Sequence, residues 1–175
     1  MSNYIIDQYR FVVADDSFTI YNADAESFQM INANGSDYYG SQVLTETSGV
    51  GGDLKQFKIY CSKEGSPAGT IRCSLFNEAG AVRLNANSDI AASSYSGVTQ
   101  LTFDFDESEE MAENDVIALY QQSGTSWSSG TSVTVMTSPT GDNDNTRAKM
   151  SNDPTAGWNI IGGGYKNNNI TITWT

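Results

Sequence analysis

Hydrophobic and polar residues alternate along several short stretches of this chain, which is the pattern of β-strands that bury one face. Leu101, Phe103 and Phe105 alternate with polar residues, and residues 170–175 alternate Ile or Trp with Thr. Clusters of Gly, Ser, Asn and Asp separate such stretches and favour turns. The pattern therefore predicts an all-β fold, an antiparallel β-sandwich.

The predicted strands are short and lie along the whole chain. They cover residues 9–13, 17–21, 27–32, 41–45, 54–62, 70–76, 81–85, 99–106, 115–121, 132–137, 145–150, 157–161 and 169–175. Glu107–Asn114 is the only segment considered as a helix, and the favoured interpretation of it is a turn before the next strand. The Ser/Gly-rich stretch Ser123–Thr131 is interpreted as a hairpin tip, because predicted strands flank it closely.

Residues 54–76 are predicted to form a hairpin around the turn-forming sequence Gly-Ser-Pro-Ala-Gly at residues 65–69. If Pro67 is the pivot, Cys61 faces Cys73 on the apolar side of both strands. Two interpretations follow for the cysteines, a cross-strand disulfide or two buried free thiols. Directly opposed strand cysteines strain the bond and close a short loop, which favours free thiols.

Composition supports one exposed β-domain. The 175 residues suffice for a single domain, although Leu, Ile, Val and Phe provide only 34 of them and the net charge is −12. Aromatic residues reach 11%, and the two-to-one excess of Ile over Leu favours strands over helices. These numbers argue against a helical bundle, a coiled coil and a membrane protein.

Charge and residue types also exclude several functions. With 9 basic and 21 acidic residues, the chain repels a phosphate backbone, so we expect no nucleic-acid binding. It has no apolar stretch of about 18 residues and no signal-peptide pattern, so we expect no membrane insertion. Histidine is absent, which excludes Ser-His-Asp catalysis and His-ligated zinc. Asp104 and Asp106 have the spacing of a carboxylate pair, but any Asp-x-Asp strand has it, and we expect no enzyme activity.

Three groups of residues are candidate sites. Asp142 and Asp144 lie in an oxygen-rich loop that suits Ca²⁺, with solvated turn residues as the favoured alternative and no other cofactor expected. Trp127 is surrounded by small polar residues, so it either stacks on a glycan or partner protein or folds back on the sandwich. Tyr38 and Tyr39 are a second candidate pair for such a contact.

Four stretches resemble a known module. Residues 52–60 read GDLKQFKIY, residues 64–71 read EGSPAGTI, residues 101–105 read LTFDF and residues 115–120 read DVIALY. Together they resemble the jelly-roll, carbohydrate-binding-module-like β-sandwich of phage and viral structural proteins and of microbial surface proteins, over about residues 48–122. The resemblance implies a non-catalytic jelly roll used for attachment, decoration or glycan contact.

From these observations we expect one domain, with residues 1–45 supplying N-terminal strands or an anchoring arm and residues 46–175 the jelly roll. The expected function is that of a non-catalytic virion structural protein exposed on the particle, as a capsid decoration or head fibre. Its partners would then be other particle subunits, including further copies of itself. The alternatives are an extracellular or cell-surface adhesin that binds glycans, and a filament subunit joined by donor strands.

Overall fold

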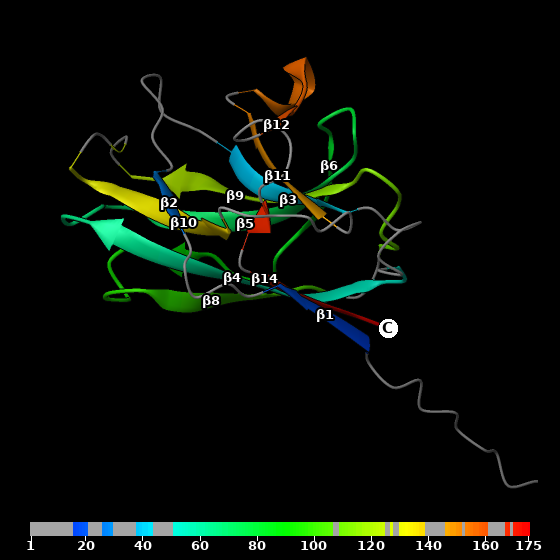
Figure 1. Ribbon diagram of the computed structural model, residues 1–175, viewed down its shortest axis with the longest axis horizontal. Helices are drawn as coiled ribbons and strands as arrows, with labels where there is room; N and C mark the ends of the chain where they lie inside the picture. Colours follow the sequence, from blue (N-terminus) through cyan, green and yellow to red (C-terminus); the bar gives the residue numbers. More distant parts are fainter. Residues whose placement is uncertain are drawn as a thin grey trace, which may run out of the picture.

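Two antiparallel β-sheets lie one above the other in the computed structural model of the chain (Figure 1). The residues that the structure describes are 16–20, 26–29, 38–43, 51–106, 109–124, 127, 130–138, 146–151, 153–160, 167–168 and 170–175. Within these ranges the only helical element is a single 3₁₀ turn, η1 (Pro154–Ala156). No helix among them is long and apolar enough to cross a membrane. The prediction of an all-β antiparallel sandwich is confirmed.

The first sheet, sheet A, is built around its longest strand. Its members are β1 (Asp16–Ile20), β2 (Glu26–Gln29), β4 (Leu54–Glu64), β8 (Thr99–Asp104), β10 (Ser132–Ser138), β13 (Asn167–Asn168) and β14 (Ile170–Trp174). One edge of β4 pairs with β8, and the other pairs first with β14 and then with β10. β1 borders β14, and β2 borders β10.

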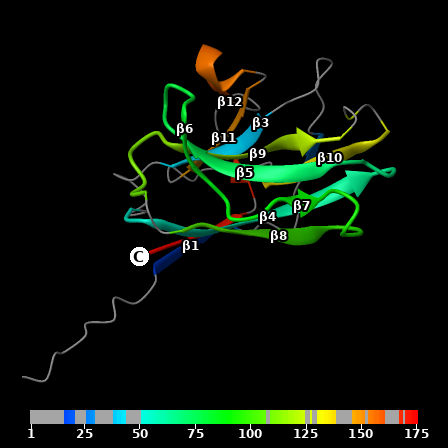
Figure 2. The ribbon, with the colours of Figure 1, turned by 180° about the vertical axis from the view of Figure 1, so that it is seen from behind.

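The second sheet, sheet B, has the order β12-β11-β3-β9-β5-β6, with β7 beside β5 (Figure 2). Its strands are β3 (Tyr38–Val43), β5 (Thr70–Phe76), β6 (Val82–Asn85), β7 (Ile90–Ala91), β9 (Val116–Ser123), β11 (Thr146–Ser151) and β12 (Asn159–Ile160). β5 and β9 pair along their whole length and form its centre.

The main core lies between the sheets and consists of the alternate residues of each strand. The sequence pattern is confirmed at residues 101–105 and 170–174, where the apolar residues are buried and the residues between them are more exposed. The apolar face expected for residues 57–75 is buried as well. Its members are Phe57, Ile59, Cys61, Ile71, Cys73 and Leu75.

The hairpin expected at residues 54–76 is wrong. β4 belongs to sheet A and β5 to sheet B, so residues 65–69 form an arch between the sheets. Ser123–Thr131 is likewise no hairpin tip, because β9 lies in sheet B and β10 in sheet A. In a hairpin and in an arch the same alternate residues face the core, so alternation alone does not distinguish the two. The face assignment was therefore right although the pairing was wrong.

Strands from the N-terminal part of the chain are incorporated into both sheets. β1 and β2 lie at the border of sheet A, whereas β3 lies inside sheet B between β9 and β11. The strand predicted at residues 9–13 lies outside the described residues. The described part of the helical candidate, residues 109–114, contains no helix and leads into β9 through a turn.

Candidate functional site

Trp127 closes one end of the main core. It is only 5% exposed, and its Nε1 donates a hydrogen bond of 2.8 Å to the carbonyl oxygen of Ala68. The arch at residues 65–69 is held against the end of β9 by Gly69, whose φ of 90° and close approach to the Ser123 carbonyl leave no room for a side chain. Of the two interpretations of Trp127, the structure has the one in which it folds back on the sandwich. Its local sequence carries no sign of this, because the burying surface comes from a distant arch.

Tyr38 and Tyr39 point to opposite sides of sheet B. Tyr39 is 2% exposed and belongs to the main core. Tyr38 is half-buried on the outer side of the sheet, and burial there raises the pKa of its hydroxyl, with smaller contributions from Tyr120 and Asp153. Only Tyr38 of the three aromatic candidates is therefore on the surface.

Cys61 and Cys73 are free and fully buried, one from each sheet. Burial raises the pKa of both thiols, so both stay protonated at neutral pH. They act as small apolar residues of the core.

The calcium candidates Asp142 and Asp144 lie outside the described residues. Within the described part of the chain, no group of three or more His, Cys, Asp or Glu side chains is arranged to hold a metal ion. The two interpretations of residues 142–144, solvated turn residues as the favoured one and a calcium site, are therefore not tested by the structure.

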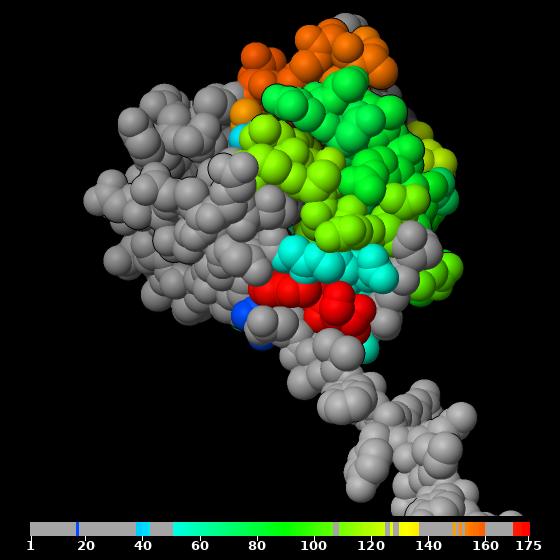
Figure 3. Space-filling view, turned by 90° about the vertical axis from the view of Figure 1, so that its right-hand side faces the viewer, coloured from blue at the N-terminus to red at the C-terminus, as the bar shows by residue number. Residues whose placement is uncertain are grey.

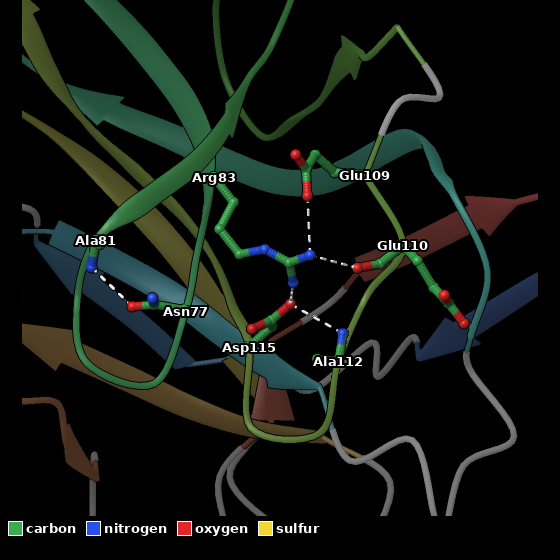
Figure 4. Close-up of polar contacts among 7 residues, drawn as sticks. All are labelled: Asn77, Ala81, Arg83, Glu109, Glu110, Ala112 and Asp115. Carbon is green, nitrogen blue, oxygen red and sulfur yellow. Dashed lines mark hydrogen bonds and ion pairs between the residues drawn. The ribbon is translucent and has the colours of Figure 1, made fainter.

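A partly buried ion-pair cluster around Arg83 lies at the end of the sandwich where β8 connects to β9 (Figure 4). The Arg83 guanidinium pairs with Asp115 through Nη1, and through Nη2 with Glu109 Oε2 at 2.9 Å. Nη2 also donates to the carbonyl oxygen of Glu110 at 2.9 Å. Arg83 lies in β6, and a 2.8 Å hydrogen bond from the Ala81 amide to Asn77 Oδ1 stabilises the turn before this strand.

This cluster joins β6 to the β8–β9 connection. Its Asp115 is only 2% exposed. Burial raises its pKa and outweighs the lowering by the Ala112 amide and by Arg83. The same connection pairs with the start of β4, since the amide of Leu54 donates to the Glu109 carbonyl at 3.2 Å. Arg83 therefore fixes the β8–β9 connection to sheet B, and the Leu54–Glu109 hydrogen bond fixes it to sheet A.

The outer side of sheet B carries a second, smaller apolar cluster. Phe76, Val116 and Ala118 are buried there, and the rings of Tyr38, Tyr120 and Trp158 pack against them. The middle row across this side consists of the small residues Gly40, Ala118 and Ser74. Outward residues two apart on a strand are separated by about 7 Å. The centroids of Tyr38 and Phe76, on the rows to either side, are only 5.7 Å apart, so their rings lean towards each other over the small row.

Trp158 completes this cluster from a different segment. Its ring meets Phe76 edge to face at 5.4 Å. Figure 3 shows its segment, in orange, beside the green turn between β5 and β6, where Pro154 closely approaches Gly80. Trp158 therefore covers the outer side of sheet B, whereas Trp174 belongs to the main core.

Polar groups adjoin these rings in a connected arrangement. Arg72 and Asp89 form a bidentate ion pair. Arg72 Nε donates to Asp89 Oδ1 at 2.8 Å, and Nη2 donates to Oδ2 at 3.1 Å. Ser74 Oγ donates to Asn85 Oδ1 at 2.7 Å and lies 3.3 Å from Tyr120 Oη. We call this surface the outer patch. Its members are Tyr38, Arg72, Asn85, Asp89 and Tyr120, which lie around the fully buried Ser74.

Of the outer patch, the sequence identified Tyr38 alone as a candidate site. Alternation along β5 already placed Arg72 and Ser74 on the side opposite the core. No sequence pattern marked Asp89 or Asn85 as site residues. Their contacts with β5 arise because β6 and β7, in residues 77–91, pair with that strand. Comparison with models of known families, with curated proteins and with solved structures finds no match to this chain.

Proposed function

We propose that this protein is a non-catalytic structural protein of a viral or phage particle, with jelly-roll topology, exposed on the particle as a decoration or fibre subunit. The all-β sandwich supports this proposal, as does the polar outer side of β4 and β8 in sheet A. Its lysine, threonine and aspartate residues suit a surface that must stay soluble at a negative net charge.

The pairing of the N-terminal strands carries the proposal. β1 and β2 follow one another along the border of sheet A, and each pairs in register with a strand from the C-terminal half of the chain. An edge strand bound through main-chain hydrogen bonds is also the unit by which one protein can add a strand to the sheet of another. The same N-terminal region is thus suited to joining a neighbouring subunit, and the partners proposed are further particle subunits.

Immunogold electron microscopy of intact particles from the source tests this role. We expect antibodies against the sandwich to label the exterior of intact particles. A chain lacking residues 1–25 should keep its β-sheet circular dichroism and disappear from the particles. Unlabelled particles, or normal incorporation of the folded truncated chain, would contradict the proposal.

The filament alternative rests on the same strands but requires self-polymerisation. Electron microscopy of the purified full chain distinguishes the two, because filaments formed by the protein alone favour the donor-strand subunit. The adhesin alternative depended on three aromatic residues. Trp127 and Tyr39 are buried, so only Tyr38 supports contact with a glycan.

A further inference from the structure

β8 lies at one border of sheet A, and β4 is the only described strand that pairs with it (Figure 2). The amide of Phe105, directly after β8, donates to the Lys55 carbonyl oxygen at 2.9 Å. Hydrogen-bonding directions alternate along an antiparallel strand, so the other odd-numbered residues of β8 also direct their main-chain groups towards β4. Gln100, Thr102 and Asp104 therefore direct theirs away from β4, to the outward edge of the sheet.

The middle of this outward edge is open. At one end, the amide of Asn87 donates to the Asp104 carbonyl oxygen at 2.8 Å. For the main-chain groups of Gln100 and Thr102, the described residues provide no hydrogen-bond partner, and both residues are exposed. The amides and carbonyl oxygens of these two residues are therefore available to another strand.

The middle of the edge also lacks the features by which proteins usually protect a border strand, such as a bulge, a proline, a lysine or a very short length. β8 has six residues and pairs with β4 without a register shift. Among the other border strands, β6 pairs through a register shift, and β12 and β13 are two residues long. Residues 98–103 are all uncharged in a chain with 21 acidic residues, and Val98 is 60% exposed.

The open edge is complementary to itself about a two-fold axis. In such an antiparallel pair, the even-numbered residues of both copies must lie opposite one another, because only they direct main-chain groups to the edge. A register centred on Thr102 would need the Asp104 carbonyl oxygen, where Asn87 is already bound. A register centred on Leu101 places Gln100 of each copy opposite Thr102 of the other and uses all of their open groups.

We infer that the protein forms a two-fold dimer in which β8 pairs antiparallel with β8 of a second copy, centred on Leu101, so that two copies of sheet A become one continuous sheet. Asp104 of each copy then lies beside Val98 of the other, which keeps the two Asp104 carboxylates at opposite ends of the interface. A short strand pairing buries little surface, as is typical of weak and reversible association. The inference does not depend on the particle role, which rests on β1 and β2 at the opposite border of sheet A.

Sedimentation velocity of the full chain, from micromolar to millimolar concentration, tests the inference. We expect a reversible equilibrium between monomer and dimer. The dimer should become more stable as salt is added, because two chains that each carry a net charge of −12 repel each other less when their charges are screened. Hydrogen exchange at the amides of Gln100 and Thr102 should slow as the protein concentration rises.

Proline variants test the edge itself. Thr102→Pro removes an amide that points away from β4, so the pairing of β4 with β8 keeps its hydrogen bonds. It should weaken dimerisation at least about tenfold, because each dimer loses two main-chain hydrogen bonds. Thr102→Ala keeps the amide and is the matched control, which should dimerise like the original chain. If thermal unfolding shows that Thr102→Pro does not fold, Gln100→Pro replaces it.

Charge at Val98 tests the register. Val98→Lys places a cation beside Asp104 of the second copy and should strengthen dimerisation about threefold, whereas Val98→Asp should weaken it by about the same factor. The side chain of Val98 is exposed, so neither substitution disturbs the core. Ala156→Lys is the control for net charge, since it adds the same charge in η1, on the side of the molecule opposite β8 (Figure 1).

Three results would overturn the inference. The first is a chain that stays monomeric at millimolar concentration. The second is a dimer whose stability is unchanged by a folded proline variant and equally affected by Val98→Lys and Ala156→Lys, which would place the contact elsewhere. The third is growth beyond the dimer into filaments, which would show that β8 meets a different edge of the second copy.

Discussion

The outer sides of the two sheets differ although both are built from alternating strands. On sheet A, the outward residues of β4 and β8 lie in polar rows, such as Gln56 beside Asp104 and Lys58 beside Thr102. The Gln56 amide donates to Asp104 at 2.6 Å in an exposed position. On sheet B, the outward side holds a buried phenylalanine and three packed rings.

This difference shows that a strand with alternating apolar and polar residues does not always expose its polar side to solvent. β9 buries four consecutive residues, Val116–Leu119, because Ile117 and Leu119 face the main core while Val116 and Ala118 lie under the outer cluster. β8 alternates between buried and exposed residues throughout. The outer side of sheet B therefore contributes to stability as a third layer, whereas the outward residues of β8 in sheet A face solvent.

The first prediction compares the two outer sides directly. Phe76→Ala should lower the free energy of unfolding by about 3 kcal/mol, because it empties the centre of a ring cluster in which Phe76 is 2% exposed. Thr102→Ala, on the outer side of sheet A, should change it by less than about 0.5 kcal/mol. Urea unfolding followed by tryptophan fluorescence measures both. Equal effects of the two substitutions would show that the outer cluster is not a packed layer.

The second prediction compares polar contacts on the two sheets. Arg83→Ala leaves Asp115 buried without its cation, and the free energy of unfolding should fall by about 2 kcal/mol, less than for a fully buried pair because the Arg83 side chain is 25% exposed. Gln56→Ala, which breaks the exposed contact with Asp104, should cost about 0.5 kcal/mol. The same urea experiment applies. A smaller loss for Arg83→Ala than for Gln56→Ala would contradict the role of Arg83 in fixing the β8–β9 connection.

The third prediction concerns the pH dependence of stability, and its expected effect is smaller. Burial raises the pKa of Asp115 in the folded chain above its ordinary value of 3.8, so the folded state keeps this proton to higher pH than the unfolded state does. Its contribution is therefore fully present below pH 3.8 and is lost as pH rises through the raised pKa. Asp115→Asn should accordingly gain stability relative to the original chain as the pH rises above 3.8. Unfolding curves at several pH values measure this, with Asp104→Asn on sheet A as the control. A difference between Asp115→Asn and the original chain that does not change with pH would contradict it.

Much of the fold was predictable because strand periodicity is a local property. Ten of the predicted strands overlap those observed between residues 38 and 175, and they bury the expected face in β4, β5, β8 and β14. The assignment of strands to sheets was not predictable in the same way. A five-residue turn-forming stretch is compatible with a hairpin and with an arch. The contacts seen in the arch, those of Trp127 with Ala68 and of Gly69 with Ser123, join residues that are far apart in the sequence.

The candidate site was less predictable, since its contacts join residues from separate strands. Tyr38 was found as an aromatic residue in a polar stretch, but Tyr120 and Trp158 gave no such signal within their own segments. Arg72 meets Asp89 from 17 positions away. Only the pairing of β5 with β9, and the return of residues 77–91 alongside it, brings these side chains together.

The last and smallest prediction concerns the hydroxyl group of Tyr120. Tyr120→Phe keeps the ring against Tyr38 and Phe76 and removes the contact of 3.3 Å with Ser74. Ser74 still donates to Asn85, so no buried donor is left unpaired, and the loss should be about 0.5 kcal/mol. Thermal unfolding of this variant beside Phe76→Ala separates the ring from the hydroxyl. If the third layer is held by ring packing, Tyr120→Phe unfolds within a few degrees of the original chain while Phe76→Ala unfolds far below it. If Tyr120→Phe lowered the melting temperature as much as Phe76→Ala, hydrogen bonds and not ring packing would stabilise the outer side of sheet B.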